Sequence, residues 1–294
     1  EGNGDHHVIQ NVIVEGNTFD CPINATLRLE KFAINRNVSV INNIFNTTFT
    51  SCAQLYACDG LIFTGNQCSA NTGGEGNVRV LESTNVLVKD NIMEGGRGLF
   101  VEDSKNVIVS DNPKITNSSM QQVHFSRVLF GKIINNNISK SGGQGETANR
   151  SVILVSGSND IIISSNTITD SDHRTIYVSN STRININGNI IKECLNGSRL
   201  VNTSDSSVNN NNIDTPVGFS SNVVELQGSN NNIVQGNRIT GNGNASFGIR
   251  FTSASEGNFV TGNMITGISN PVYSNSDSPN NTEINNYPLP TPLV

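Results

Sequence analysis

The sequence lacks several features that would point to a function at once. Trp is absent, aromatic residues make up only 5% of the 294 residues, and charged residues make up 14%. No apolar run approaches the roughly eighteen residues that a membrane-spanning helix needs, and no signal-peptide pattern starts at Glu1. Clusters of Lys and Arg are also missing, and the formal net charge is −6. Because binding to phosphate backbones needs such clusters, we expect neither a nucleic-acid partner nor a membrane span.

Cysteine is scarce and irregularly placed. The five cysteines include no CxxC pair, so the sequence indicates neither a zinc site nor a redox motif. We therefore expect no metal site and no cofactor. A bridge across a turn is open to Cys52 and Cys58, whereas the place of Cys68 in its repeat predicts a buried apolar thiol.

What the sequence has in abundance is Asn, together with Val and Ile in short bursts. Val and Ile favour strands, the low content of Leu and Ala disfavours helices, and disordered chains lack such regular apolar bursts. These features predict an all-β protein whose core repeats along the chain.

One phrase, approximately apolar-x-apolar-x-x-Asn-x-apolar, recurs from end to end, as in VIVEGNTF at 12–19 and IIISSNTI at 161–168. Its Asn returns about every 21 to 30 residues, a spacing typical of solenoid coils with turn loops of variable length. A twelfth, partial coil places Tyr287 where Asn is expected, so the ladder of Asn residues is predicted to end there. The eleven ladder positions are Asn17, Asn43, Asn66, Asn91, Asn112, Asn136, Asn166, Asn189, Asn211, Asn237 and Asn263.

The phrase has a physical explanation. Alternation points one set of side chains inward, and the Asn that follows is suited to a tight left-handed bend. Stacked Asn side chains can hydrogen-bond along their column and satisfy the buried turn. A second apolar strand lies between successive phrases, as in VRVLE at 78–82 and VILV at 152–155. We therefore expect two or three short strands in each coil, with Gly and Ser at the corners.

These Asn-rich repeats resemble those of the pectate-lyase-like, NosD-type right-handed parallel β-helix superfamily across nearly the whole chain. The resemblance implies a single right-handed parallel β-helix, a solenoid of about eleven to twelve coils over residues 1–287, followed by an extended tail at 288–294. Members of that superfamily include polysaccharide lyases and hydrolases, uronan epimerases, phage tailspike depolymerases and structural or adhesive proteins, so the fold alone selects no function. The sequence contains no polygalacturonase-type GHG or paired DD and no epimerase-type DPHD motif.

The second strand of each coil presents an outward row of side chains that is suited to a polysaccharide. Pyranose rings stack on aromatic faces, and guanidinium groups pair with carboxylates or sulfates. The alternative is that an aromatic and Arg ladder only stabilises the sheet face. By sequence alignment the row runs Arg28, Tyr56, Arg79, Phe100, His124, Leu154, Tyr177, Val201, Val224, Arg250 and Tyr273.

A second row, just before these strands, holds Arg97, Arg150, Arg174 and Arg199. It would attract an acidic polymer despite the negative net charge, because the local field matters more than the total charge. The alternative is a set of solvated corner residues that pair with nearby carboxylates. From the two rows we select the substrate-binding candidates Arg28, Tyr56, Arg79, Phe100, Arg150, Arg174, Tyr177 and Arg199.

Hydrolysis of a glycosidic bond would need two carboxylates roughly 5 to 9 Å apart. Adjacent coils lie about 4.8 Å apart, so Glu82 on one coil and Glu102 or Asp103 on the next are the candidates. Strand-edge carboxylates are also common on surfaces without any catalytic role.

An eliminative lyase would instead need a base beside a neutralised uronate. The available pairs are His124 with Arg127 and His173 with Arg174. The catalytic candidates are therefore Glu102, Asp103, Glu82 and His124.

Two functions remain open. The first is an extracellular β-helix that binds, and in the manner of a tailspike or secreted lyase or hydrolase cleaves, a polysaccharide. The second is a non-catalytic structural protein of the cell surface or virion that forms a homo-oligomer or filament through the helix ends. No cap is evident at either end, and open ends of a β-helix are sheet edges that need cover. We favour carbohydrate binding, because the aromatic and Arg residues gather on one strand; the sequence does not decide whether the protein is an enzyme.

Overall fold

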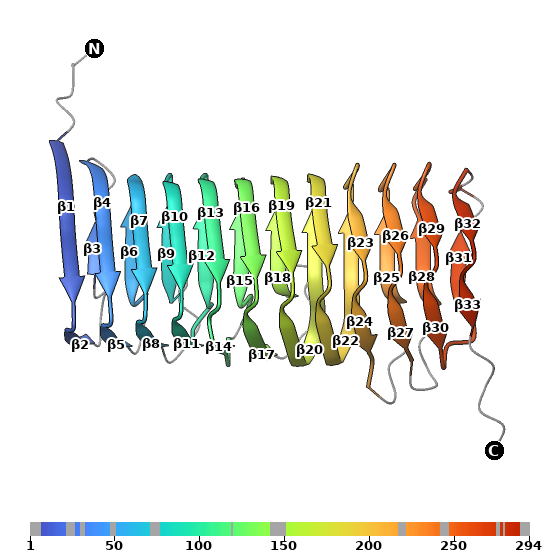
Figure 1. Ribbon diagram of the computed structural model, residues 1–294, viewed down its shortest axis with the longest axis horizontal. Helices are drawn as coiled ribbons and strands as arrows, with labels where there is room; N and C mark the ends of the chain where they lie inside the picture. Colours follow the sequence, from blue (N-terminus) through green and yellow to red (C-terminus); the bar gives the residue numbers. More distant parts are fainter. Residues whose placement is uncertain are drawn as a thin grey trace, which may run out of the picture.

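The computed structural model describes residues 7–21, 27–29, 33–47, 51–70, 77–118, 120–141, 151–216, 222–241, 247–274, 277–278 and 280–288. All regular structure in these ranges is β, and every strand pairs in parallel with the strands of neighbouring coils, which confirms the predicted right-handed solenoid (Figure 1). The described part of the chain has no helix that could cross a membrane. Of the predicted tail at 288–294, only residue 288 lies within the described residues.

Each coil contributes up to three strands, and the strands of successive coils form three stacks. The first stack is a twelve-stranded sheet, so the predicted number of coils is confirmed. Its strands are β1 (His7–Glu15), β4 (Ala33–Ile41), β7 (Cys58–Thr64), β10 (Thr84–Lys89), β13 (Lys105–Ser110), β16 (Leu129–Ile134), β19 (Asn159–Ser164), β21 (Thr182–Asn187), β23 (Ser207–Asn209), β26 (Ile233–Gln235), β29 (Phe259–Thr261) and β32 (Thr282–Ile284).

The other two stacks join into one 21-stranded sheet, because two long strands, β20 (Thr167–Ser179) and β22 (Ile190–Val201), run through both. The second stack also contains β2 (Thr18–Cys21), β5 (Ile44–Thr47), β8 (Gln67–Ala70), β11 (Ile92–Gly95), β14 (Lys114–Thr116), β17 (Asn137–Ser141), β24 (Asn212–Asp214), β27 (Arg238–Thr240), β30 (Met264–Thr266) and β33 (Tyr287–Pro288). The third stack also contains β3 (Leu27–Leu29), β6 (Ala53–Tyr56), β9 (Val78–Leu81), β12 (Leu99–Glu102), β15 (Val123–Ser126), β18 (Ser151–Ser156), β25 (Asn222–Gln227), β28 (Phe247–Thr252) and β31 (Val272–Ser274).

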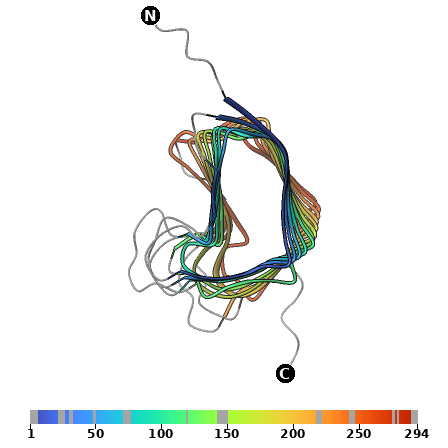
Figure 2. The same cartoon turned by 90° about the vertical axis from the view of Figure 1, so that its left-hand side faces the viewer.

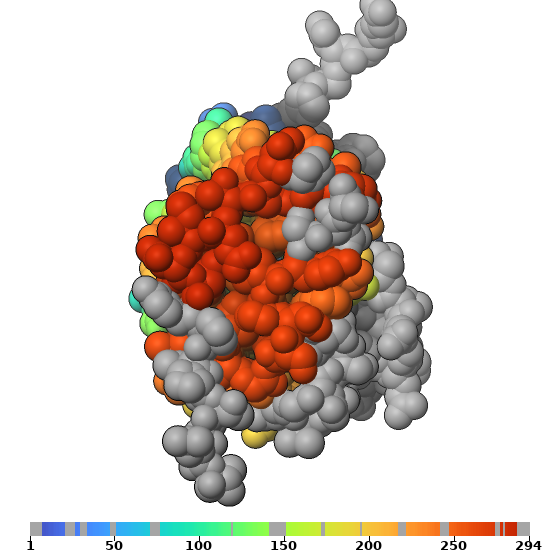
Figure 3. Space-filling view, turned by 90° about the vertical axis from the view of Figure 1, so that its right-hand side faces the viewer, coloured from blue at the N-terminus to red at the C-terminus, as the bar shows by residue number. Residues whose placement is uncertain are grey.

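Seen along the helix axis, the coils superimpose on one closed cross-section (Figure 2). Its interior is filled by buried Val, Ile, Leu and Phe side chains, which stack in register from coil to coil, as Leu61, Val86 and Val107 do in the first stack. Figure 3 looks onto the C-terminal end, where the last coils, coloured orange to red, form the visible face. The core is therefore a column that runs the length of the molecule.

The Asn ladder stabilises the corner between the first and second stacks. The backbone N–H and the side-chain amide of Asn66 both donate to Oδ1 of Asn91, at 2.9 and 3.1 Å, and the amide also donates to the carbonyl of Val40 at 2.8 Å. The pattern repeats in every coil. It satisfies the buried polar groups of a turn that water cannot reach.

The ladder has one more member than the sequence predicted. Asn263 donates from its backbone and its side chain to Oδ1 of Asn286, at 3.1 and 2.9 Å. The prediction that the ladder ends at Tyr287 is therefore wrong: Tyr287 pairs with Met264 in the second stack, and the twelfth Asn is the residue before it. The left-handed residue is likewise not the ladder Asn but its predecessor, as with Gly65 before Asn66.

A shorter ladder of Ser hydroxyls stabilises the corner between the third and first stacks. Ser83 Oγ accepts from the backbone N–H of Cys58 at 3.0 Å, and Ser104 Oγ accepts from that of Ser83 at 3.1 Å. Similar bonds recur through Ser158, Ser229 and their neighbours. At this corner Ser hydroxyls accept the backbone N–H bonds that Asn side chains accept at the corner between the first and second stacks.

Four cysteines lie in the core as free thiols: Cys52, Cys58, Cys68 and Cys194. Cys52 and Cys58 are both free, so the bridge considered between them is not formed. Cys68 is fully buried, as predicted. Burial raises the pKa of Cys58 to about 12 and that of Cys194 to about 11, so both stay protonated and unreactive.

Candidate functional site

The outward side chains of the third stack form one continuous line, here called the outward row. Strand pairing fixes its register, because residues directly paired across a parallel ladder lie side by side. The row consists of Arg28, Gln54, Arg79, Phe100, His124, Leu154, Tyr177, Arg199, Glu225, Arg250 and Tyr273.

Three members of the predicted row were assigned wrongly. Tyr56 and Val201 also face outward but lie two residues further along their strands, and Val224 points into the core. The places are taken by Gln54, Arg199 and Glu225. Alternation identifies which side chains face outward, but Gln54 and Tyr56 satisfy it equally, and only the length of the preceding corner decides between them.

The predicted second row of Arg residues is only partly a row. Arg97 and Arg174 both lie two residues before the first core residue that their coil gives to the third stack, Leu99 and Ile176 respectively. Arg199 belongs to the outward row instead, and Arg150 lies outside the described residues, as does the side chain of His173. The structure thus brings the described Arg candidates to one face of the helix, in two neighbouring lines.

The densest part of this face is a cluster around Phe100. The ring centroids of Phe100 and His124 lie 4.9 Å apart. The guanidinium groups of Arg79 and Arg97 lie 5.6 and 5.2 Å from the centroid of Phe100, within the range of cation–π attraction. Arg97 Nε also donates to Gln121 Oε1 at 2.8 Å. The cluster is rigid, because each group is held by at least one other.

His124 is held as a neutral ring. Its Nδ1 lies 3.2 Å from Arg97 Nη2, and since a guanidinium can only donate, Nδ1 is the acceptor. Nε2 then carries the proton and donates to Ser156 Oγ at 3.3 Å. Burial, with the positive charge of Arg97, lowers the pKa of His124 to about 3. With both nitrogens engaged, the ring positions Arg97 and is not poised as a general base.

The carboxylate candidates lie at the bend that follows the third stack. Glu82, Asp103 and Arg127 occupy equivalent left-handed positions in successive coils, so Glu82 and Asp103 are in adjacent coils as expected. Arg127 Nε donates to Asp103 Oδ1 at 2.6 Å, and Arg127 Nη2 donates to Glu102 Oε1 at 2.7 Å. These carboxylates raise the pKa of Arg127 above its ordinary value.

This arrangement bears on what the carboxylates can do. A general acid must be free to pass a proton to the leaving group, whereas Arg127 holds Glu102 and Asp103 in ion pairs. Glu102 and Asp103 are therefore arranged as an ion-pair network at the rim of the face. The geometry suits binding better than acid-catalysed hydrolysis.

Further along the row, aromatic and Arg side chains continue to alternate. The guanidinium of Arg174 lies 5.2 Å from the centroid of Tyr177. Arg199, the next residue in the row, pairs with Glu225 at 3.2 Å and donates to Gln227.

A second aromatic cluster lies near the C-terminal end of the row. The rings of Phe247 and Tyr273 are 4.6 Å apart, and Arg250 lies 4.9 and 5.8 Å from their centroids. Arg250 Nε is buried and has no hydrogen-bond partner among the described residues. The sequence analysis missed Phe247, because this residue lies at the start of its strand and outside the aligned row. The available signal was Arg250, three residues later in the same strand.

Comparison with known proteins agrees with the fold. Residues 143–287, slightly under half of the chain, match the family model described as periplasmic copper-binding protein (NosD). No curated protein matches the chain. Several solved structures do, at sequence identities that show the fold alone.

Three of these structures illustrate the likeness. The A-module of the mannuronan C-5 epimerase AlgE6 from Azotobacter vinelandii is 14% identical with a TM-score of 0.55, over 98% of this chain and 92% of that chain. DFA-IIIase from Arthrobacter chlorophenolicus A6 is 16% identical with a TM-score of 0.55, over 85% of this chain and 65% of that chain. A mutant of the periplasmic alginate epimerase AlgG is 10% identical with a TM-score of 0.59, over 96% of this chain and 75% of that chain. The chain is thus a parallel β-helix protein by its fold, and its residues 143–287 are similar to the NosD family model.

Among the described residues, no site fits the copper that the family description names. Copper prefers imidazole, thiolate and thioether ligands held together. Within the described ranges, no group of three or more His, Cys, Asp or Glu residues is placed to hold a metal ion. Cys194, which lies in the matched segment, is buried in the core with a raised thiol pKa. We therefore derive no chemistry from copper.

Proposed function

We propose that the protein binds an acidic polysaccharide along the outward row of the third stack. The observation that carries the proposal is the repeated pairing of a guanidinium with an aromatic ring: Arg79 and Arg97 at Phe100, Arg174 at Tyr177, and Arg250 at Phe247 and Tyr273. Glu225 is the row's only carboxylate, and Arg199 pairs with it.

This pattern suits a chain of uronate or sulfated sugars. Aromatic faces receive the apolar faces of pyranose rings, and guanidinium forks bind carboxylates and sulfates. Because strands in adjacent coils lie about 4.8 Å apart, the row offers a line of contacts along the helix axis, the direction in which a linear polymer extends. The printed names of two fold relatives, a mannuronan epimerase and an alginate epimerase, support a polysaccharide ligand.

A finer proposal is that binding is accompanied by cleavage, in the manner of a secreted lyase or hydrolase or a tailspike. The candidates remain Glu82, Glu102, Asp103 and His124. The bridging of Glu102 and Asp103 by Arg127, and the engagement of both nitrogens of His124, weigh against this finer form. Binding without cleavage is the function that the geometry supports best.

We also propose a periplasmic or extracellular location, with the cell surface or virion as the finer form. The word periplasmic in the matched family description and in the name of AlgG supports it. The alternative function, a structural rod that self-associates end to end, is supported by the position of β1 and β32 at the two edges of the first stack. Sedimentation in the absence of polysaccharide tests that alternative, because it requires large ordered assemblies.

Binding is tested by calorimetry with two polyuronates, alginate and polygalacturonate, and with neutral dextran. Tyr177→Ala removes the ring that Arg174 covers, and we expect it to weaken polyuronate binding about tenfold, equal to roughly 1.4 kcal/mol. Arg238→Gln is the matched control, because Arg238 is an exposed Arg of the second stack, outside the outward row. We expect it to bind as the unaltered protein does.

Equal affinity for dextran and polyuronate, or an unchanged Tyr177→Ala variant, would contradict the proposal. The same mixtures are followed for new reducing ends and for the absorbance of unsaturated uronate. Cleavage that is lost in a Glu102→Gln variant would establish the finer, catalytic form.

A further inference from the structure

A repeated bend in the first stack contains a bulky aromatic residue. In each coil, one residue near the start of the first-stack strand has a positive φ, and the stacked positions before and after Phe130 are Asn106 and Asp160. Asn and Asp tolerate this left-handed conformation, whereas bulky side chains adopt it at a cost in free energy. Phe130 adopts it with φ of 58°.

The strain at Phe130 is not explained by packing. The side chain is 48% exposed, so it contributes little to the core. The next residue, Gly131, does face the core, where the ring of Phe125 fills the space that a side chain would take. In this column Asn, Asp and Gly predominate, and Arg183 is the other long side chain. A strained, exposed aromatic residue there indicates a contact that the isolated chain does not make.

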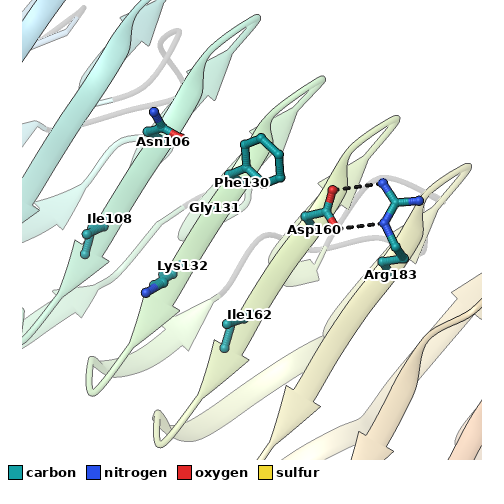
Figure 4. A pocket seen from close by; sticks show the side chains of 8 residues that line it. All are labelled: Asn106, Ile108, Phe130, Gly131, Lys132, Asp160, Ile162 and Arg183. Atoms are coloured by element: carbon teal, nitrogen blue, oxygen red, sulfur yellow. Dashed lines mark hydrogen bonds and ion pairs between the residues drawn. The ribbon is translucent and has the colours of Figure 1, made fainter.

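Phe130 forms one wall of a hollow of about 490 Å³ on the outer face of β13, β16, β19 and β21. Its apolar floor includes Ile108 and Ile162, and Asp160 and Arg183 form the opposite polar wall through two hydrogen bonds of 2.7 and 2.8 Å (Figure 4). The volume lies within the range of small-molecule sites, roughly 300 to 1,000 Å³. The hollow can therefore enclose one or two sugar rings rather than a long chain.

The charges around the hollow select an anion. Asp160 neutralises Arg183, with Asp205 also close enough to act on it. Two cations remain: Lys132 in the lining and Lys105, whose Nζ lies 5.7 Å from the centroid of Phe130. Neither lysine forms an ion pair with another described residue. An aromatic ring with Lys105 near it and Lys132 in the same hollow, beside a fixed carboxylate–guanidinium pair, matches a pyranose ring that carries a carboxylate.

We propose that this hollow is a second saccharide-binding site, in which the ring of a uronic acid stacks on Phe130 while its carboxylate pairs with Lys132 or Lys105. The site lies on a different sheet from the outward row, so it does not depend on the function proposed for that row. The hollow would take a single sugar or the end of a polysaccharide chain. The outward row would instead contact a long internal stretch of such a chain.

The test uses the intact chain and a background variant. In Tyr177→Ala, where binding along the outward row is weakened, glucuronate and short glucuronate oligosaccharides are titrated against the protein and followed by NMR of the aromatic ring protons. Phe130→Asn inserts the residue type found at the neighbouring bends. We expect it to reduce uronate affinity at least tenfold while the urea midpoint of unfolding stays unchanged or rises, because the left-handed strain is removed. Lys132→Gln is expected to reduce uronate affinity without changing the weaker binding of neutral glucose.

Three results would overturn the proposal. The first is an unchanged uronate affinity in Phe130→Asn, and the second is equal affinity of the protein for glucuronate and glucose. The third is a lower urea midpoint in Phe130→Asn, because that would give the ring a structural role. Loss of polymer binding in Tyr177→Ala alone concerns the outward row and leaves this site intact, so the two proposals fail separately. Comparing the affinity for glucuronate with that for its oligosaccharides shows whether the site prefers a free acidic sugar or the end of a chain.

Discussion

At the scale of single residues, the face of the third stack is built from pairs in which one side chain fixes another. His124 shows this most clearly, because burial keeps it neutral and Arg97 fixes its tautomer. Its role as the partner of Arg97 could not be foreseen from the sequence, where it appeared as a free His beside Arg127. Only the register of β12 and β15 brings Arg97, from the preceding corner, to the ring.

The neutral state of His124 predicts a pH dependence of stability. Its pKa is about 3 in the folded chain and near 6.5 in the unfolded chain, so between these values the unfolded state binds more protons. The contribution is fully present above pH 6.5 and is lost as the pH falls towards 3. Between pH 7 and pH 5 we expect a loss on the order of 1–2 kcal/mol in the free energy of unfolding.

The measurement is urea unfolding at both pH values, with His124→Gln for comparison. Gln can still accept from Arg97 and donate to Ser156 but does not titrate. The variant is therefore expected to lose less stability than the unaltered protein over this range. An equal loss in both proteins would show that other groups carry the pH dependence.

At the scale of the strand, inward positions do not all hold large side chains. Gly131 of β16 occupies a core position that is Val107 in one neighbouring coil and Ile161 in the other. A Cβ built there would lie 2.7 Å from Phe125 Cε2 and 2.9 Å from Ile161 Cδ1. Gly131 thus leaves room for the large side chain of Phe125 on β15 in the same coil. The repeat pattern alone did not indicate this match.

This match predicts a coupled pair. Gly131→Ala is expected to lower the free energy of unfolding by about 1–3 kcal/mol through overpacking. Phe125→Leu makes room at the point of contact, so the double variant is expected to be more stable than the sum of the two single effects implies. A double-mutant cycle by urea unfolding measures the coupling; strictly additive effects would mean that the backbone moves apart instead.

At the scale of the whole molecule, the Asn ladder joins all twelve coils in one hydrogen-bonded column. Its period made most of the fold predictable: the strand type, the number of coils and eleven of the ladder positions follow from the spacing of Asn. The last position was missed because the final coil carries adjacent Asn285 and Asn286 before Tyr287, and the alignment moved past them. The lateral register of the third stack was harder, because it depends on corner lengths that vary from coil to coil.

The ladder also predicts where the molecule is most sensitive to a polar-to-apolar change. Asn166 Oδ1 accepts two hydrogen bonds of 3.0 Å from Asn136, and its amide donates to the carbonyl of Ile133 at 2.8 Å and to Asn189 Oδ1 at 3.0 Å. Asn166→Ala leaves several buried groups unsatisfied, and we expect it to lower the free energy of unfolding by roughly 3 kcal/mol or more. Asn137→Ala, at an exposed position of β17 in the preceding coil, should change it by no more than about 0.5 kcal/mol.

Urea unfolding followed by circular dichroism compares the two variants. Because coils are stabilised by their neighbours, Asn166→Ala is also expected to broaden the transition, as the coils on either side of the defect separate into two units. Similar losses in the two variants would mean that the ladder contributes little beyond the chain's ordinary turn preferences.

The same ladder gives the molecule an electrical direction. Between Asn17 and Asn286 each side-chain amide donates one N–H to the Asn oxygen of the next coil, so the Asn-to-Asn bonds all run in one direction and the side-chain dipoles add rather than cancel. The other N–H returns to a carbonyl of the previous coil, as from Asn66 to Val40. The column begins with an oxygen and finishes with an N–H, which makes the two faces of any coil chemically unlike. A further coil, whether from this chain or from another copy, can therefore continue the column in one polarity only, head to tail.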